Sequence, residues 1–380
     1  MTTQEVPELS VRFPAWHISP AGFTPPGKGP AAAAARIFAV IQDWLLVETL
    51  GEEPVIVGQG RSMKNFVPIA VFLRRNPNLA AIQTAIAETV ATGQGLASIT
   101  PNTNRVIRTE PVVMTDGRIH GVHVWCGPSD AEPPERPIPG PLKWDLTTRE
   151  ATDSVEALIN AGMDPDVEPT HGRSFADDFP SSAANQDEAK VLALAIDPEP
   201  GHTYCATWDG PDKQGLFRRT GFVSRILVET AEDGTEHIVG RSMNLSVEVR
   251  DTPFRADDLS KRILTGTSQP GIYRAILDLS DWALLKWLDE PCPLFDWRGK
   301  VTAHPEDHEH FSERMAEELK TGSTSAVLRL PGNDGGWVPL HVTIGRIELE
   351  DGVYGGLVTL RLPTDKELAD VGLAADGVTR

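Results

Sequence analysis

Two segments of the chain carry apolar residues at the spacing of an amphipathic helix. In the first segment these residues are Leu79, Ile82, Ile86 and Val90, and in the second they are Phe311, Met315 and Leu319. A proline stands near the start of each segment, and a glycine, Gly93 or Gly322, follows its last turn. Prolines at helix starts and glycines after helix ends are typical boundaries. The pattern therefore predicts two helices, each with one face packed on a sheet.

Strand-like segments surround both predicted helices. Residues 44–50 and 55–57 precede the first helix, and residues 96–100, 105–114 and 119–125 follow it. Residues 325–330, 337–347 and 354–362 follow the second helix. An Asp-Gly pair, which is typical of a turn, lies before the last strand of each set. Both regions are therefore predicted to be small domains of mixed α and β structure.

One stretch of sequence occurs twice. Asp43-Trp44-Leu45-Leu46 returns as Asp281-Trp282-Ala283-Leu284, and the helix ends and Asp-Gly turns then follow in the same order. An internal repeat of this kind has to be resolved before the fold is argued. We interpret residues 43–126 and 281–362 as two versions of one domain. Trp44 and Trp282 are predicted to occupy equivalent buried core positions on its opening strand.

Prolines mark the expected domain boundaries. Residues 1–35 are predicted to form an extended N-terminal arm, and residues 129–140 a proline-rich linker. The remaining segments are a first domain at 36–128, a middle domain at 141–268, a last domain at 269–365 and a C-terminal tail at 366–380. In the middle domain we expect a helix begun by a Thr147–Glu150 capping box, a helix at 188–196, and strands at 202–208, 216–230 and 237–245. The predicted fold class is α+β, with an antiparallel sheet and flanking helices in each of three domains.

The charge, the apolar runs and the cysteines of the chain limit the functions that it can have. The formal charge of −19 disfavours binding to nucleic acid and to anionic membrane surfaces. No apolar run approaches the length of a membrane span, so no membrane insertion is expected. Cys126, Cys205 and Cys292 are far apart in sequence and form no CxxC pair, which favours buried reduced thiols and a cytoplasmic location.

The chain resembles a known family of sensor proteins. The helix opened by His304-Pro305-Glu306-Asp307, the Asn333-Asp334-Gly335-Gly336-Trp337 hairpin and the closing strand with Tyr354 are similar to the second half of PAS domains. By the internal repeat, the first domain is similar too. The middle domain resembles a GAF domain, with a PAS domain as the alternative. Over residues 36–365 the chain resembles the actinobacterial family of tandem PAS-GAF-PAS proteins, which implies signalling or scaffolding without a catalytic step.

The candidate chemistry is sparse. His304, His308 and His310 offer ligands for a metal or for haem, but their spacing fits neither, and a helix-start motif is favoured. His120 and His123 are three residues apart on a predicted strand, so they face opposite sides and do not share a metal. No catalytic residue and no metal site are predicted, and the cofactor is left unknown.

The functional expectation is a non-enzymatic signalling or scaffolding protein that acts through protein partners, with a small-molecule ligand in a PAS or GAF domain. The alternatives are a haem-binding or other cofactor-binding redox or gas sensor, and an enzyme with a site between domains.

Four residues are expected on the second face of the outer sheets: His123 and Trp125 in the first domain, and Trp337 and His341 in the last. Aromatic residues are enriched at the centres of interfaces, so these four are the candidate interface residues. They are expected either to hold the three domains together or to form the docking surface for a protein partner.

Overall fold

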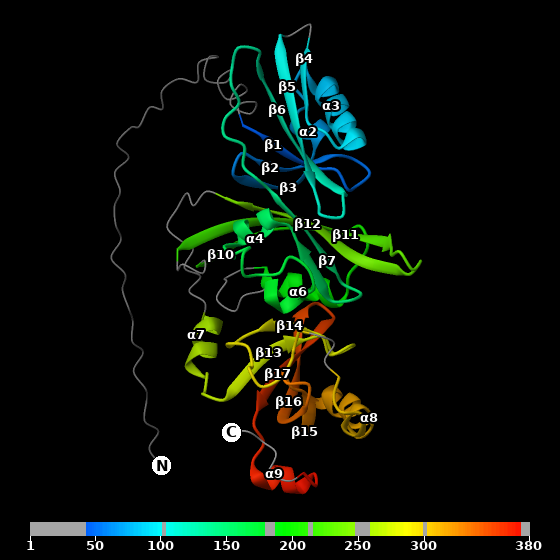
Figure 1. The fold of residues 1–380 in the computed structure, drawn as a ribbon, viewed down its shortest axis with the longest axis vertical. Helices are drawn as coiled ribbons and strands as arrows, with labels where there is room; N and C mark the ends of the chain where they lie inside the picture. Colours follow the sequence, from blue (N-terminus) through cyan, green and yellow to red (C-terminus); the bar gives the residue numbers. More distant parts are fainter. Residues whose placement is uncertain are drawn as a thin grey trace, which may run out of the picture. The chain divides into compact units, whose positions relative to one another are not determined.

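The computed structural model describes residues 43–100, 104–178, 187–211, 216–247, 259–298 and 302–373. The predicted N-terminal arm at 1–35 lies outside the described residues. Three antiparallel sheets follow one another along the chain, and each has its own helices (Figure 1). The prediction of a three-domain α+β protein is confirmed.

The first domain has a six-stranded sheet in the order β3-β2-β1-β6-β5-β4. Helix α3 lies along one face of this sheet (Figure 1). There Ile82 and Ile86 pack with Val47, Val122 and Val124. The left-handed Gly93 (φ 68°) ends α3, as its position in the sequence predicts. The elements are β1 (Leu45–Glu48), β2 (Val55–Gln59), β3 (Ser62–Pro68), α2 (Ile69–Phe72), α3 (Leu79–Thr92), β4 (Leu96–Thr100), β5 (Arg105–Val113) and β6 (Ile119–Pro128).

The middle domain has a six-stranded sheet in the order β10-β11-β12-β7-β8-β9. Trp144 lies in its core, where its ring contacts Phe175 (4.8 Å between centroids) and stacks on Phe222 (5.0 Å). Helix α6 has the predicted bounds. The elements are β7 (Gly140–Asp145), β8 (Glu150–Asp153), α4 (Val155–Ala161), β9 (Arg173–Ser174), α5 (Phe175–Asp178), α6 (Glu188–Ile196), β10 (Thr203–Pro211), β11 (Phe217–Thr230) and β12 (Glu236–Ser246).

The last domain has a five-stranded sheet in the order β14-β13-β17-β16-β15. Helix α8 covers one face with Phe311, Met315 and Leu319, as their spacing predicts. The elements are α7 (Leu259–Gly266), which precedes the sheet, β13 (Ile272–Leu277), β14 (Leu284–Trp287), α8 (Pro305–Thr321), β15 (Ser323–Pro331), β16 (Trp337–Glu350), β17 (Val353–Arg361) and α9 (Asp365–Asp370).

All three sheets share one topology. In each, the first strand pairs with both the second and the last strand, and the last strand pairs with the one before it. The first two sheets add a third strand, β3 or β9, beside the second strand. The repeat inferred from the outer domains therefore extends to the middle domain, although the Asp-Trp stretch does not recur there.

The structure corrects the register of the repeat. Trp44 directly precedes β1, which lies inside its sheet, whereas Trp282 lies in the turn before β14, an edge strand equivalent to β2. Trp44 is buried, as predicted, and its indole Nε1 donates to the carbonyl of Pro134 (2.9 Å). Trp282 is half-buried and has a left-handed backbone (φ 67°). The two tryptophans are not equivalent, because the shared Asp-Trp pair begins different strands.

Two further differences concern local elements. Residues 146–149 form the turn between β7 and β8, and Glu150 begins β8. In this turn the Asp145 carboxylate accepts from the amides of Thr147 and Thr148. Helix α4 begins instead at Ser154, whose hydroxyl accepts from the Ala157 amide. The segment predicted as a tail contains α9, which is held by a capping box of Thr364 and Glu367.

The second face of the first sheet packs on the middle domain. Leu46, Val57 and Val112 meet Val223 and Met243 in one apolar cluster. Within this contact the Arg225 guanidinium donates to both carboxylate oxygens of Glu48, at 2.7 and 3.0 Å. Such a bidentate pair is geometrically specific as well as strong. It fixes one orientation of the two sheets.

His120 is buried in the same contact. Its Nδ1 lies 2.9 Å from the carbonyl oxygen of Ser242, and Arg241 donates to Nε2 at 3.2 Å. This arrangement fits a neutral ring protonated at Nδ1. Burial lowers the pKa of His120 to about 4, and burial together with the charge of Arg136 lowers the pKa of His123 to about 3.

These two histidines predict acid sensitivity. The unfolded chain binds protons at an ordinary histidine pKa, whereas the folded chain excludes them, so stability falls as pH drops below the unfolded value. From about pH 7 to about pH 5, the free energy of unfolding should fall by about 2 kcal/mol for each histidine. Denaturant unfolding of His120→Gln should show a weaker pH dependence than the wild type. His202 is exposed, so His202→Gln is the control and should keep the pH dependence of the wild type. If His120→Gln also keeps the wild-type pH dependence of unfolding, the buried neutral state of His120 is contradicted.

A candidate ligand cavity in the C-terminal domain

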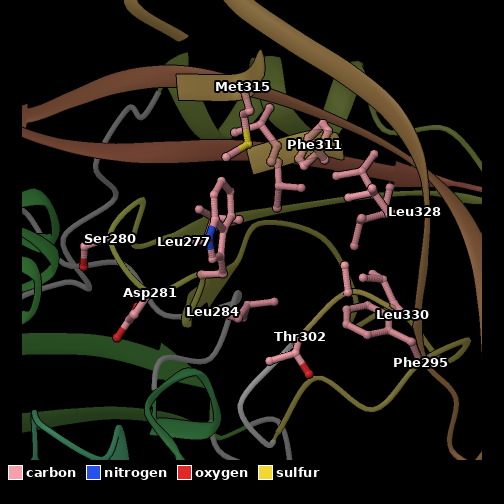
Figure 2. Close-up of a pocket in the computed structure, with 16 residues that line it drawn as sticks. Leu277, Ser280, Asp281, Leu284, Phe295, Thr302, Phe311, Met315, Leu328 and Leu330 are labelled. Atoms are coloured by element: carbon pink, nitrogen blue, oxygen red, sulfur yellow. The ribbon is translucent and has the colours of Figure 1, made fainter. Parts of the chain in front are cut away.

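A cavity of about 410 Å³ lies between the sheet of the last domain and α8. This volume is in the range of small-molecule sites, which are mostly apolar and have few polar groups. Figure 2 shows side chains from the sheet and from α8 converging on this space. Most of the lining is apolar, including Leu277, Phe295, Phe311, Met315, Leu328 and Val342.

The sequence builds these walls through ordinary periodicities. Phe311 and Met315 are one helical turn apart and therefore share a face of α8. Alternation along β16 places Val342 and Ile344 on the same side of the sheet. The start of α8 is anchored to β15, where the Arg329 guanidinium donates to Asp307 at 2.7 Å. The helix therefore holds its apolar face over the sheet.

The polar lining is concentrated in the turn between β13 and β14. Ser280 and Asp281 lie beside Trp282 in this turn, and Thr302 is the remaining polar lining residue. In Figure 2 the carboxylate of Asp281 is directed away from Met315 and Phe311. The cavity interior is therefore an apolar surface with a polar rim.

Arg149 of the middle domain binds this turn. It donates through Nε to Asp281 (2.9 Å) and through the guanidinium to Asp278 (2.5 Å) and to the carbonyl of Ala195 in α6 (2.6 Å). The Asp278 side chain is only 1% exposed. Arg149 itself has a left-handed backbone (φ 66°) at the β7–β8 turn, a conformation that is uncommon for residues with a side chain. The sequence gives no signal for Arg149, because its two carboxylate partners, Asp278 and Asp281, are 129 and 132 residues away.

The candidate interface residues of the first domain lie inside the chain. His123 and Trp125 are both buried, and the ring of His123 lies 6.0 Å from that of Trp44. Neither ring nitrogen of His123 has a hydrogen-bond partner among the described residues. His123 and Trp125 therefore present no exposed surface to a separate protein.

The candidate interface residues of the last domain are less buried. Trp337 is 45% exposed and packs edge-on against His304 (5.0 Å between centroids). His341 lies 3.4 Å from Glu367 of α9, and its pKa is lowered by burial and by Arg361. The structure does not bring Trp337 and His341 together with His123 and Trp125 in one described cluster.

The groups considered for metal or redox chemistry are accounted for as far as they are described. His304 caps α8, where its ring accepts from the Glu306 amide (3.4 Å). The side chains of His308 and His310 lie outside the described residues. In the described ranges no group of three His, Cys, Asp or Glu side chains could hold a metal ion. Burial raises the pKa of the Cys126 and Cys205 thiols, and that of Cys292 to about 11, so all three remain protonated at neutral pH.

None of the described helices is both long enough and apolar enough to cross a bilayer.

The fold and the cavity define a three-domain α+β protein with a ligand-sized space in its last domain. Family models described as Rv3651-like match all three parts: the N-terminal model at residues 43–135, the middle-domain model at 138–247 and the C-terminal-domain model at 257–371. The chain belongs to the Rv3651-like family.

A solved structure supports this assignment. The crystal structure of an uncharacterised protein from Mycobacterium tuberculosis is 55% identical, with a TM-score of 0.80, over 87% of this chain and 99% of that one. An RNA-binding light-oxygen-voltage receptor aligns at 10% identity and a TM-score of 0.22, over 61% of this chain and 99% of its own. The E. coli DhaR(N)–DhaL complex aligns at 14% identity and a TM-score of 0.17, over 56% of this chain and 83% of its own. The last two likenesses are too weak to carry an argument, and no curated protein matches the chain.

Proposed function

We propose that this protein is a non-enzymatic sensor or scaffold that binds an apolar small molecule in its C-terminal domain and relays the bound state by contact with a protein partner. The observation that carries the proposal is the cavity of about 410 Å³ between the sheet and α8. A pocket of this size, lined mostly by apolar side chains, has the dimensions and the chemistry of a small-molecule site. An apolar ligand would restore the contacts that the lining side chains lack.

The topology supports the sensing role. Two strands, a helix and three antiparallel strands, with the first and last strands adjacent, resemble the arrangement of a PAS domain, in which a ligand lies between the sheet and its helices. The last domain has this order, and the first and middle domains have the same strand order with one added strand. We therefore interpret the three domains as an array similar to the tandem PAS-GAF-PAS family. Because fold alone does not deliver function, the cavity carries more of the weight than the topology.

The cavity lining favours an uncharged apolar ligand over haem. The described lining offers one sulfur atom, that of Met315, and no histidine as an axial ligand. Among the described lining residues only Asp281 is ionisable, and its carboxylate is already bound by Arg149. A charged ligand in the apolar interior would lose its hydration without a partner.

Filling the cavity tests the proposal. N-phenyl-1-naphthylamine is a neutral apolar probe whose fluorescence rises in apolar surroundings, and we expect it to bind the wild type in a saturable manner. Ala303 lines the cavity, so Ala303→Phe should reduce affinity about tenfold or more by occupying the space, a loss of about 1.4 kcal/mol. Ala97 is exposed on β4, and Ala97→Phe makes the same chemical change away from the cavity. Equal binding by the wild type and Ala303→Phe would contradict the proposal, as would no binding to the wild type.

A further inference from the structure

The turn between β13 and β14, residues 278–283, belongs to two environments at once. On one side Trp282 forms part of the cavity wall. On the other side Asp278 and Asp281 hold Arg149 of the middle domain, at 2.5 and 2.9 Å. One short segment therefore contacts both the proposed ligand space and a neighbouring domain.

Local hydrogen bonds make this turn a single unit. The Trp282 amide donates to the Asp278 carbonyl (2.9 Å), and the Asp278 amide donates to the Ala283 carbonyl (2.9 Å). The Asp278 carboxylate also accepts from the amide and the hydroxyl of Ser280, at 2.8 and 2.7 Å. A shift of the Trp282 ring cannot easily leave Asp278 and Asp281 in place, because these hydrogen bonds tie the backbone of the turn together.

The two positions at the ends of this link have unusual backbone conformations. Trp282 (φ 67°) and Arg149 (φ 66°) are both left-handed, although neither is glycine. Such conformations persist only where the surroundings hold them, and they concentrate at switching and ligand-binding sites. Here Arg149 and the turn that contains Trp282 hold each other, because Arg149 pairs with Asp278 and Asp281 of that turn.

Arg149 carries the contact further into the middle domain. Its guanidinium donates to the Ala195 carbonyl near the end of α6. Helix α6 is buried on most sides, because Val191 and Leu192 pack with Ile276 and Leu285 of the last sheet as well as with the middle-domain core. Lys286 of β14 also pairs with Glu188 at the start of α6 (2.6 Å). The junction between these two domains is therefore polar at both ends of α6 and apolar between them.

We propose that the β13–β14 turn reports the occupancy of the C-terminal cavity to the middle domain, with Arg149 as the residue that receives the change. This inference rests on the proposed function for its ligand, whereas the contacts of Arg149 with Asp278 and Asp281 are present without one. A ligand that presses on Trp282 changes the geometry of Asp278 and Asp281, and so the contacts of Arg149 with α6. The ligand can shift this junction only by its differential affinity for the two arrangements.

Hydrogen exchange in the full-length protein tests the link without any ligand. Trp282→Ala should raise the exchange rate of the amides at residues 145–151 several-fold. Met315→Ala is the matched control, because it also removes a large lining side chain but from α8. Unchanged exchange at 145–151 in Trp282→Ala, or an equal rise in Met315→Ala, would overturn the proposal.

A second variant tests the link from the other side. Arg149→Met should raise amide exchange at residues 278–284, because it removes the hydrogen bonds that Asp278 and Asp281 accept from Arg149. Arg219→Met removes an equally close ion pair, that with Asp209 (2.6 Å), inside the middle domain, and should leave 278–284 unchanged. No rise in Arg149→Met, or the same rise in Arg219→Met, would overturn the proposal even if Trp282→Ala does not fold.

A third experiment measures hydrogen exchange with N-phenyl-1-naphthylamine bound. In the wild type the bound probe should alter exchange at 145–151, and Arg149→Met should abolish this response while Arg219→Met keeps it. Probe binding without any response at 145–151 overturns the link and leaves the proposed function intact. Absence of probe binding overturns the proposed function, and the two ligand-free variants then still decide whether the link exists.

Discussion

Replacing Arg225 by methionine should lower the free energy of unfolding by about 3–5 kcal/mol, which is the cost of leaving a buried charge without its partner. Glu48 is 2% exposed and receives two hydrogen bonds from the Arg225 guanidinium. Methionine keeps the length of the side chain but provides no donor. The carboxylate of Glu48 would then remain desolvated in the contact between the first and middle sheets. Chemical denaturation followed by tryptophan fluorescence measures the loss.

The double variant Glu48→Gln/Arg225→Met separates the charge from the packing. Removing both charges should restore about half or more of the lost stability, because replacing both partners avoids the unpaired buried charge. Arg225 also lies 5.5 Å from the centre of the Phe66 ring, so some loss of packing will persist in both variants. A double variant no more stable than Arg225→Met would show that the ion pair does not dominate this contact.

The two tryptophans of the repeated Asp-Trp stretch should respond differently to truncation. Trp44→Ala removes a large buried side chain and its hydrogen bond to Pro134, and should cost about 3–5 kcal/mol of stability. Trp282→Ala removes a half-buried side chain at the cavity wall, and should cost about 1–2 kcal/mol.

Denaturant unfolding of both variants, with the wild type in parallel, makes the comparison. Trp282→Ala should also weaken binding of N-phenyl-1-naphthylamine, whereas Trp44→Ala should not. Equal losses of stability in the two variants would favour the sequence-based equivalence of Trp44 and Trp282, and would contradict the register given by the sheets.

The parts of the fold that were predictable are those with a clear period. Leu79, Ile82 and Ile86 give α3, and Phe311 and Met315 give α8, because each set covers one helical face. Long alternating segments gave β11, β12 and β16 close to their observed bounds. These elements depend on local patterns and on turn residues, which a single sequence displays directly.

The parts that escaped prediction depend on contacts between distant residues. Strand β7 begins at Gly140, directly after the prolines of the predicted linker, so its composition resembles a connection. The repeated Asp-Trp pair suggested a shared strand start, but at Asp281 and Trp282 it forms a turn held by Arg149. No local pattern reports a partner 132 residues away.

The candidate site was less predictable than the fold. The periodicity of Phe311 and Met315 predicts an apolar helix face, but it does not show whether the sheet fills the space beneath that face. The candidate interface residues followed from strand alternation. His123 and Trp125 proved to be buried within the chain, because neighbouring segments cover the face that the alternation identified.

Native mass spectrometry of the full-length protein tests the central claim, that the C-terminal cavity holds an apolar ligand, most directly. Wild-type protein purified from its native cells without detergent should carry a stoichiometric extra mass that organic solvent removes. Ala97→Phe should keep this mass, and Ala303→Phe should lose it. Wild-type protein with no bound molecule, or an Ala303→Phe variant that retains the full extra mass, would contradict the account.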